Sequence, residues 1–277
     1  MPDSDIRDLG IGRAEQDNFL IGAWPLRDAG RDAAHGKGLS GVYCLVVITR
    51  PINTRLSIQD RKGRAREAEE LISKFMSLVW HDALAPELIN EFARHVTSLR
   101  FADLVTMETM NSTLWSRPEH RLYDHIVFNA QGDPRLANEE AAETSYGHVT
   151  SHPQNMGETI QEKACEVEHH PDGTKSCFLP QPPKYIRILY DPLDGEGHPL
   201  KSFQTIQVRD VRPEEDPIDG GGDRTLHSYI LLLAVRRRAQ EAEPDCIRTF
   251  SMDGMPIEPR VQAPYTNTDW HVGEPGH

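Results

Sequence analysis

The apolar run Tyr229–Val235 constrains the fold more than any other stretch of the chain. It is too short to cross a bilayer, which needs roughly 20 residues, and its length suits a strand buried on both faces. A polar link follows, and then Cys246–Phe250, whose alternation fits a partner strand with one solvated face. Asp253 and Gly254 then supply the residue pair that tight turns favour. This part of the chain therefore predicts a hairpin.

The composition bounds the size and the class of the protein. A chain of 277 residues can bury a sizeable core, in one large domain or in two smaller ones. The formal net charge of −13 argues against broad binding of nucleic acid or anionic membranes. The start, Met1–Asp5, lacks the basic and apolar segments of a signal peptide. We therefore expect a soluble protein of the cytoplasm or nucleus, with no membrane partner and no nucleic-acid partner.

The N-terminal part predicts a mixture of strand and helix. Residues 1–17 are polar and acidic, which predicts a flexible arm, whereas Val42–Thr49 is rich in β-branched residues and predicts a buried strand. Apolar residues recur at helical spacing from about residue 63 to 80, and again after Pro86, which suits the first turn of a helix. The two helices together predict a helical hairpin. We therefore assign residues 18–128 to a mixed α/β part.

The rest of the chain mostly repeats with a period of two. Residues 129–162 are polar and rich in turn residues, which predicts a linker or a mobile insertion, and residues 163–277 form a β-rich part. The predicted strands before the final hairpin are Leu122–Phe128, Ala164–His169, Lys175–Leu179, Lys184–Tyr190 and Phe203–Val208. We therefore expect an α+β fold, with a mixed N-terminal part and a mainly antiparallel β-sheet in the C-terminal part.

Gly36, Gly38 and Gly41 satisfy the pattern G-x-G-x-x-G. In a dinucleotide site this pattern follows a strand and opens a helix. Here we expect a strand after it, which is the wrong context. A protein kinase would also need a lysine on the next strand and the motifs H-R-D and D-F-G, which the sequence lacks. We therefore interpret residues 36–41 as a turn-forming loop.

Four residues of metal-binding type flank a turn signal at Pro171-Asp-Gly: Cys165, His169, His170 and Cys177. Two thiolates and two imidazoles would suit Zn²⁺. Alternation along a strand places His169 and His170 on opposite faces, so at most one could join Cys165. The spacing matches no standard zinc finger. A polar hairpin with free thiols and no cofactor is the first interpretation, and a zinc site at Cys165, His169 and Cys177 is the alternative.

Several segments resemble the ubiquitin-specific peptidases. Gly38–Cys44 is similar to that family's Cys box, G-L-x-N-x-G-N-T-C-Y, and Pro182–Leu189 to its L-P-P strand, while Tyr229–Val235 is similar to its Y-x-L-x-A-V strand. The Cys box lacks its Asn, Tyr-Cys replaces Cys-Tyr, and His271–His277 only faintly matches the family's G-H-Y ending. The resemblance implies a degenerate, catalytically inactive relative that keeps a protein-binding surface for a ubiquitin-like partner.

The same resemblance names the residues of an alternative, a thiol hydrolase. Cys44 would be the nucleophile, and His271 or His277 would be the base that activates it. The place of Cys44 in an apolar run instead predicts burial, which raises the pKa of a thiol and makes it inert. We therefore expect a protein that works by binding another protein, with the thiol hydrolase and the zinc protein as alternatives.

Overall fold

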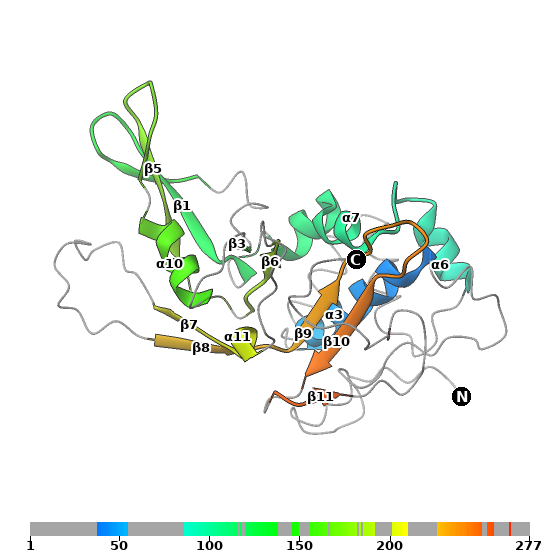
Figure 1. Ribbon diagram of the computed structural model, residues 1–277. Helices are drawn as coiled ribbons and strands as arrows, with labels where there is room; N and C mark the ends of the chain where they lie inside the picture. The colour runs from blue at the N-terminus through cyan, green and yellow to red at the C-terminus, as the bar shows by residue number, and fades with distance from the viewer. Residues whose placement is uncertain are drawn as a thin grey trace. The chain divides into compact units, whose positions relative to one another are not determined.

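The computed structural model describes thirteen parts of the chain: residues 38–54, 86–115, 117, 120–137, 146–149, 156–165, 167–181, 183, 185–191, 201–209, 226–250, 254–257 and 266 (Figure 1). They form helices and strands, and the strands lie mostly in the C-terminal half and pair mostly antiparallel. The predicted α+β class is confirmed. None of the helices in these parts has both the length and the apolar composition that a membrane span requires.

The chain divides into two compact units. Unit 1 comprises residues 1–110, 232–272 and 276–277, and unit 2 comprises residues 111–231 and 273–275. The predicted boundaries after residues 17, 128 and 162 stay predictions. Regular structure does occur inside residues 129–162, where two strands and most of a helix are found.

Helix α3 (Ser40–Thr54) is the most deeply buried element of unit 1. Every side chain from Ser40 to Thr49 is buried. The prediction of a strand over Val42–Thr49 is therefore wrong in type, although its burial is confirmed. A run that is apolar on all sides has no polar face, so its periodicity cannot separate a buried strand from a buried helix. The helix also continues through Pro51, a residue that usually ends regular structure.

Three further helices belong to unit 1: α6 (Pro86–Ala93), α7 (Phe101–Thr106) and α8 (Glu108–Met110). Helix α6 begins at Pro86 as predicted, and it buries Phe92 completely. The helix predicted over residues 63–80 lies outside the described residues, so the helical hairpin stays a prediction. Helix α7 buries Phe101 and Leu104, and it packs against α3.

The sheet of unit 1 has the strand order β11-β10-β9. Strands β9 (Leu233–Arg236) and β10 (Cys246–Phe250) pair antiparallel, which confirms the predicted hairpin. Strand β11 (Pro256–Ile257) follows Gly254, whose φ of 79° agrees with the predicted turn. The burial differs from the prediction, because β10 is buried on both faces, apart from the half-buried Arg248, and β9 is only half-buried. The apolar run also breaks before β9, and its first residues belong to another strand.

The main sheet of unit 2 has the strand order β2-β1-β5-β4. Its strands are β1 (Tyr123–Phe128), β2 (Pro134–Leu136), β4 (Val167–His169) and β5 (Lys175–Pro180). The strands predicted over Leu122–Phe128 and Lys175–Leu179 are confirmed to within one residue at each end. All pairs in this sheet are antiparallel.

Helix α10 (Met156–Cys165) packs against strand β5. The hydroxyl of Tyr123 in β1 donates a hydrogen bond of 3.1 Å to the carbonyl oxygen of Ile160, which ties the helix to the sheet. The strand predicted over Ala164–His169 is wrong at its start, because Ala164 and Cys165 end this helix. Only one residue separates α10 from β4, so the alternating pattern of the strand is too short to mark where the helix stops.

The remaining elements of unit 2 are η2 (Asn111–Trp115), β3 (Gly147–Val149), β6 (Ile188–Tyr190), α11 (Lys201–Gln204), β7 (Thr205–Arg209) and β8 (Leu226–Ile230). Strand β6 pairs parallel with β3, and β7 pairs antiparallel with β8. The predicted strand Lys184–Tyr190 is therefore shorter than expected, and the strand predicted over Phe203–Val208 begins as a helical turn. Short strands leave too few alternating residues for the sequence to fix their bounds.

Aromatic rings and a half-buried cation help to fill unit 2. The guanidinium carbon of Arg187 lies 4.2 Å from the ring centre of Trp115 and 5.0 Å from that of Tyr146. Both separations are typical of cation–π contacts. Burial lowers the pKa of Arg187 to about 10. The cation thus stays charged at neutral pH while it packs between aromatic side chains.

Candidate functional site

Cys44, the predicted nucleophile, lies inside helix α3 with 0% of its surface exposed. Burial raises the pKa of its thiol well above the ordinary value, and the nearby Asp245 and Cys246 raise it further. A nucleophilic cysteine needs a thiolate that a substrate can reach, and Cys44 is protonated and enclosed. His271 and His277 lie outside the described residues, so their proposed role as the base stays a prediction.

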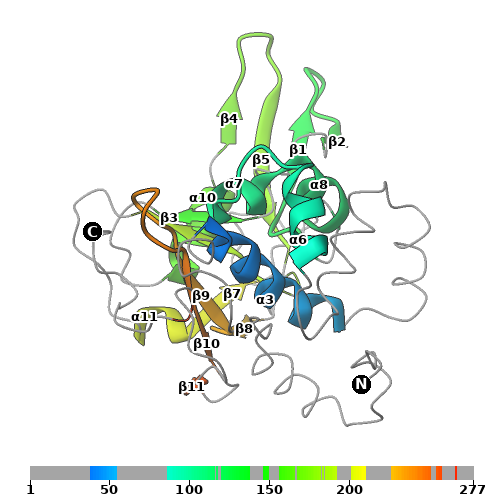
Figure 2. The ribbon, with the colours of Figure 1, turned by 90° about the vertical axis from the view of Figure 1, so that its right-hand side faces the viewer.

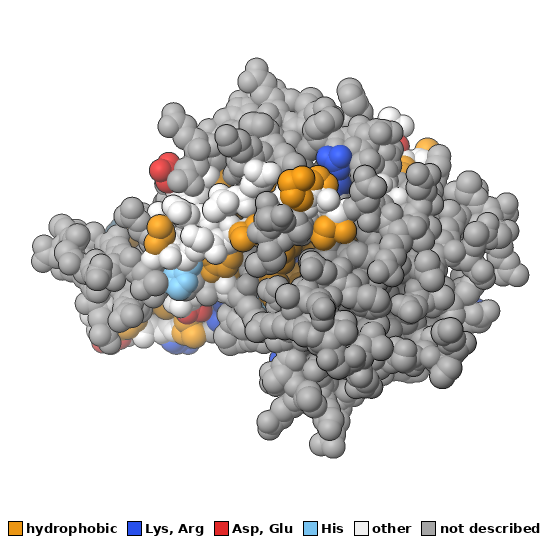
Figure 3. Space-filling view, turned by 90° about the horizontal axis from the view of Figure 1, so that it is seen from below, with side chains coloured by type: hydrophobic (Ala, Val, Ile, Leu, Met, Phe, Trp, Pro, Cys, Tyr) orange, Lys and Arg blue, Asp and Glu red, His pale blue; other side chains and the backbone are white. Residues whose placement is uncertain are grey.

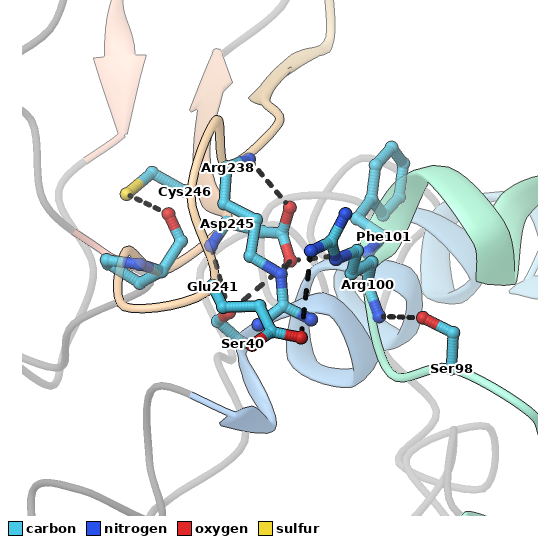
Figure 4. Close-up of polar contacts among 9 residues, drawn as sticks. Ser40, Ser98, Arg100, Phe101, Arg238, Glu241, Asp245 and Cys246 are labelled. Carbon is cyan, nitrogen blue, oxygen red and sulfur yellow. Dashed lines mark hydrogen bonds and ion pairs between the residues drawn. The ribbon is translucent and has the colours of Figure 1, made fainter. Parts of the chain in front are cut away.

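Asp245 forms a buried polar centre beside helix α3 (Figure 4). Its Oδ2 accepts hydrogen bonds from the Ser40 hydroxyl at 3.4 Å and from the Phe101 amide at 3.2 Å. Its Oδ1 accepts from the Arg238 amide at 3.0 Å, and the Arg238 Nε lies 3.6 Å from Oδ2. The Asp245 amide donates to the Ser40 hydroxyl at 2.9 Å. We call these residues, Asp245, Ser40, Phe101 and Arg238, the Asp245 centre.

The Asp245 centre lies at the N-terminal ends of α3 and α7. Helix N-termini carry amide groups without partners in the helix and a partial positive charge, so a carboxylate there is stabilising. The hydrogen bonds of Asp245 all stay within unit 1. We therefore assign the Asp245 centre to the folding of unit 1 and not to the binding of a ligand.

Close packing explains Gly41, the last glycine of the pattern G-x-G-x-x-G. It lies in the first turn of α3, so a helix and not the expected strand follows the pattern, and the interpretation as a turn-forming loop is wrong at this position. A Cβ atom at Gly41 would overlap the carbonyl oxygen of Leu99 and the amide nitrogen of Phe101. Glycine is therefore required because α3 packs closely against the chain that leads into α7.

The predicted zinc ligands occupy different environments. Cys165 ends helix α10, and its side chain is not among those described. His169 lies two residues from Val167, which pairs with Cys177, so His169 and Cys177 share one face of the sheet. Cys177 is buried and His169 is exposed. The Nε2 of His170 lies 2.9 Å from the hydroxyl oxygen of Ser176.

Within the described ranges, no group of three or more His, Cys, Asp or Glu side chains is suited to hold a metal ion. The described cysteines Cys44, Cys177 and Cys246 are not joined in disulfides, which agrees with the free thiol predicted at Cys177. The zinc site at Cys165, His169 and Cys177 stays a prediction, because the thiol of Cys165 is not placed.

The two hairpins of the main sheet close through the same loop geometry, and Figure 2 shows both loops at one end of the sheet. In the β1–β2 loop the Gly132 amide donates to the Asn129 carbonyl at 2.9 Å, and the φ of Gly132 is 86°. In the β4–β5 loop the Gly173 amide donates to the His170 carbonyl at 3.0 Å, and the φ of Gly173 is 84°. Each loop is thus a tight turn followed by a left-handed glycine. The end of β1 pairs with the start of β5, so both loops lie at the same end of the sheet.

Side chains fix the shape of both loops. The Asn129 Oδ1 accepts hydrogen bonds from the amides of Gln131 and Asp133, at 3.0 and 2.8 Å. The Asp172 Oδ1 accepts from the amide and the hydroxyl of Thr174, at 3.0 and 2.6 Å, and these bonds lower the pKa of Asp172. The Asp172-Gly173 turn that the sequence predicts is confirmed. Exposed loops that are ordered by their own side chains lose little conformational entropy when a partner binds.

One row of side chains across the main sheet is entirely apolar. The registers place Leu136 opposite Ile126, Ile126 opposite Cys177, and Cys177 opposite Val167. We call these four residues the apolar row, and it runs through all four strands on one face. Cys177 inside the row is buried, whereas Leu136 and Val167 at its ends are 49% and 50% exposed. Apolar area therefore remains in water at both edges of the sheet.

The β7–β8 ribbon offers a second, weaker candidate surface. Ile206 and Val208 of β7 are buried, whereas Leu226 and Ile230 of β8 are exposed. Figure 3 shows exposed hydrophobic side chains (orange) on one face of the described part of the molecule. Leu226 and Ile230 lie at opposite ends of β8 with the exposed Ser228 between them, so they form no continuous apolar row.

The two edges of the main sheet differ in their backbone groups. The amide of His170 donates to the carbonyl of Thr174 at 2.9 Å, and hydrogen-bonded pairs alternate along an antiparallel ladder. The N–H and C=O groups of Val167 and His169 therefore point away from β5. By the same alternation, the backbone groups of Pro134 and Leu136 in β2 point away from β1. Proline has no N–H, so Pro134 offers only its C=O group. Among the described strands, none lies beyond β4 or β2.

Comparison with protein-family models, with curated proteins and with solved structures finds no match to this chain. The resemblance to the ubiquitin-specific peptidases is therefore still an expectation drawn from the sequence.

Leu136 and Val167 were not identified by the sequence analysis. Val167 lies between two glutamates, and Leu136 has only the small Ala137 as an apolar neighbour, so neither residue gives a signal of its own. Their significance comes from the strand register, which aligns them with Ile126 and Cys177. The Gln131-Gly132 and Asp172-Gly173 pairs are the signals in the sequence that could have placed both hairpins and hence the row.

Proposed function

We propose that this chain is a protein-interaction protein of the cytoplasm or nucleus, related to inactive members of the ubiquitin-specific peptidases. The main sheet of unit 2 is the proposed contact surface, and a ubiquitin-like protein is the first partner to test. The observation that carries the proposal is the apolar row, because its ends at Leu136 and Val167 stay half-exposed at two edge strands. Exposed apolar area beside open strand edges is typical of surfaces that bind proteins.

The burial of Cys44 supports binding over thiol chemistry. Its side chain has no exposed surface, and its raised pKa keeps the thiol protonated at neutral pH. A deubiquitinase-like reaction at Cys44 would require α3 to open, and α3 is buried along its described side chains. The net charge of −13 adds a reason to expect a protein partner and not a nucleic acid.

The proposal is tested by comparing the wild-type chain with the double variant Leu136→Ser, Val167→Ser in affinity purification and in titration with ubiquitin. We expect the wild-type protein to bind a specific partner and the double variant to bind it about tenfold or more weakly. Met255→Ser is the matched control, because Met255 is also exposed but belongs to unit 1. Recovery of no specific partner, or of the same partner by the double variant, would contradict the proposal.

Two assays test the alternatives that involve chemistry. An activity-based ubiquitin probe should not label the native protein, and labelling that disappears in Cys44→Ala would replace our proposal with the thiol hydrolase. Elemental analysis should find less than about a tenth of an equivalent of zinc, well below the full occupancy of a structural site. A full equivalent that is lost in Cys177→Ser would instead establish the zinc protein.

A further inference from the structure

We infer that the outer edge of strand β4, beyond which no described strand lies, pairs with an extended, basic peptide segment, in which an apolar residue lies opposite Val167 and a Lys or Arg lies opposite Glu168. The inference rests on the proposed function and names the class of partner that the sheet binds. An extended segment that adds a strand to a sheet edge gains its affinity from backbone hydrogen bonds and its specificity from alternate side chains.

The backbone of β4 supplies the pairing groups. Val167 and His169 each turn one N–H and one C=O away from β5, so an incoming strand can form hydrogen bonds with both residues. Both residues are exposed. The β2 edge is the poorer site, because Pro134 occupies one of its outward positions and offers no N–H. Natural sheets use proline in this way to protect an edge, and β4 contains no proline.

The side chains of β4 define the partner's chemistry. Val167 is 50% exposed at the end of the apolar row, so an apolar residue opposite it extends the row by one strand. Glu168 points to the other face and is also exposed. A basic residue opposite Glu168 forms a cross-strand pair of opposite charges. The net charge of −13 on the whole chain attracts a basic segment in the same way.

A second copy of this chain fits the edge poorly. The antiparallel register that pairs all three residues of β4 with those of another β4 places Glu168 opposite the same residue of the other copy. Like charges directly opposite each other destabilise a strand pair. Each copy also carries a net charge of −13, so two copies repel. The charges therefore favour a different, basic partner.

Labelled synthetic peptides test the inference by fluorescence anisotropy. A short peptide of alternating valine and lysine should bind, and one of alternating valine and glutamate should bind about tenfold more weakly or not at all. N-methylation of the valine residues removes the amides that face β4 and should abolish binding. N-methylation of the lysine residues is the matched control, because those amides face away from β4.

Variants of the protein test the same contacts from the other side. Glu168→Lys should weaken binding of the valine–lysine peptide about tenfold, whereas the same charge change at the exposed Glu241 of unit 1 should have little effect. His169→Pro should abolish binding, because it removes an outward N–H without removing a hydrogen bond to β5, and His169→Ala should not. Thermal melts of each variant establish that it is folded.

Amide exchange gives a readout that does not depend on any substitution. The amides of Val167 and His169 should exchange quickly in the free protein and slow by about tenfold or more when the valine–lysine peptide is saturating, while Glu168 should be slow in both states. Equal binding of the N-methyl-valine peptide, or of the valine–glutamate peptide, would overturn the inference. So would the absence of any binding. If a partner's binding depends on Leu136 but not on Glu168 or His169, the inference fails while the proposed function stands.

Discussion

The Asp245 centre of unit 1 and the β4 edge of unit 2 differ in whether their hydrogen-bonding groups are paired. In the Asp245 centre, a buried carboxylate accepts hydrogen bonds from Ser40, Phe101 and Arg238, so the polar groups hold segments of the same unit together. At the β4 edge, the N–H and C=O groups of Val167 and His169 point away from β5, and the side chain of Val167 beside them is half-exposed. The difference shows that a polar group inside unit 1 is paired within the unit, whereas the outer groups of β4 have no partner among the described strands and are the ones that our proposal assigns to binding.

Removal of the Asp245 carboxylate should give the largest effect on stability. We expect Asp245→Ala to lower the free energy of unfolding by about 3–5 kcal/mol, because the buried Arg238 loses its carboxylate and the Phe101 amide loses its acceptor. Urea unfolding of the purified protein measures the change. Asp245→Asn keeps the shape and should cost less. A loss below about 1 kcal/mol for Asp245→Ala would show that the centre does not hold unit 1 together.

A methyl group at Gly41 should have the next largest effect. We expect Gly41→Ala to lower the free energy of unfolding by about 1–3 kcal/mol, because its Cβ overlaps backbone atoms of Leu99 and Phe101 that cannot move aside easily. Gly38→Ala is the matched control, because nothing lies within 4 Å of a Cβ at that position. It should change stability by less than about 0.5 kcal/mol. Equal effects of the two substitutions would contradict the close packing of α3.

Stability should fall at alkaline pH through the buried thiol of Cys44. The pKa of this thiol is raised in the folded state, so above about pH 8.5, the pKa of an unfolded thiol, only the unfolded protein ionises. The free energy of unfolding is therefore unaffected below that pH and falls as the pH rises from there toward the pKa of the folded thiol. Between about pH 7.5 and 9.5 the wild-type protein should lose roughly 1 kcal/mol more than Cys44→Ala. Urea unfolding at both pH values measures the difference. An equal loss in the two proteins would indicate that Cys44 ionises in the folded state.

Substitutions at the ends of the apolar row should have the smallest effect on stability. Leu136→Ser and Val167→Ser should each change the free energy of unfolding by about 0.5 kcal/mol or less, because both side chains are half-exposed. The same substitutions should weaken partner binding strongly if the row is a contact surface. Thermal melts and binding titrations of the same samples compare the two effects. A large loss of stability would mean that Leu136 and Val167 serve the fold and not a partner.

Features that depend on neighbours in sequence could be predicted. The start of α6 at Pro86, the strand that begins near Leu122 and the Asp172-Gly173 turn each follow from the local preferences of a few residues. The hairpin of β9 and β10 follows from two apolar segments and a polar link. Such signals place elements along the chain, but they do not say which elements meet.

Features that depend on distant partners could not be predicted. Asp245 binds Phe101 and Ser40 across 144 and 205 residues of sequence, and no local pattern identifies such a pair. Helix α3 was predicted as a strand because full burial removes the polar face that would reveal its period. The apolar row likewise needs three strand registers to be known together.

The long sequence separation between α3 and Asp245 has a consequence during protein synthesis. A ribosome that adds roughly 5–20 residues per second exposes the apolar run of α3 for on the order of ten to forty seconds before Asp245 emerges. The two glycine-containing hairpins of unit 2 need only local contacts, and they can close in microseconds once made. We therefore expect the nascent chain to require shielding by a chaperone at α3, while the main sheet of unit 2 assembles without waiting for the C-terminus.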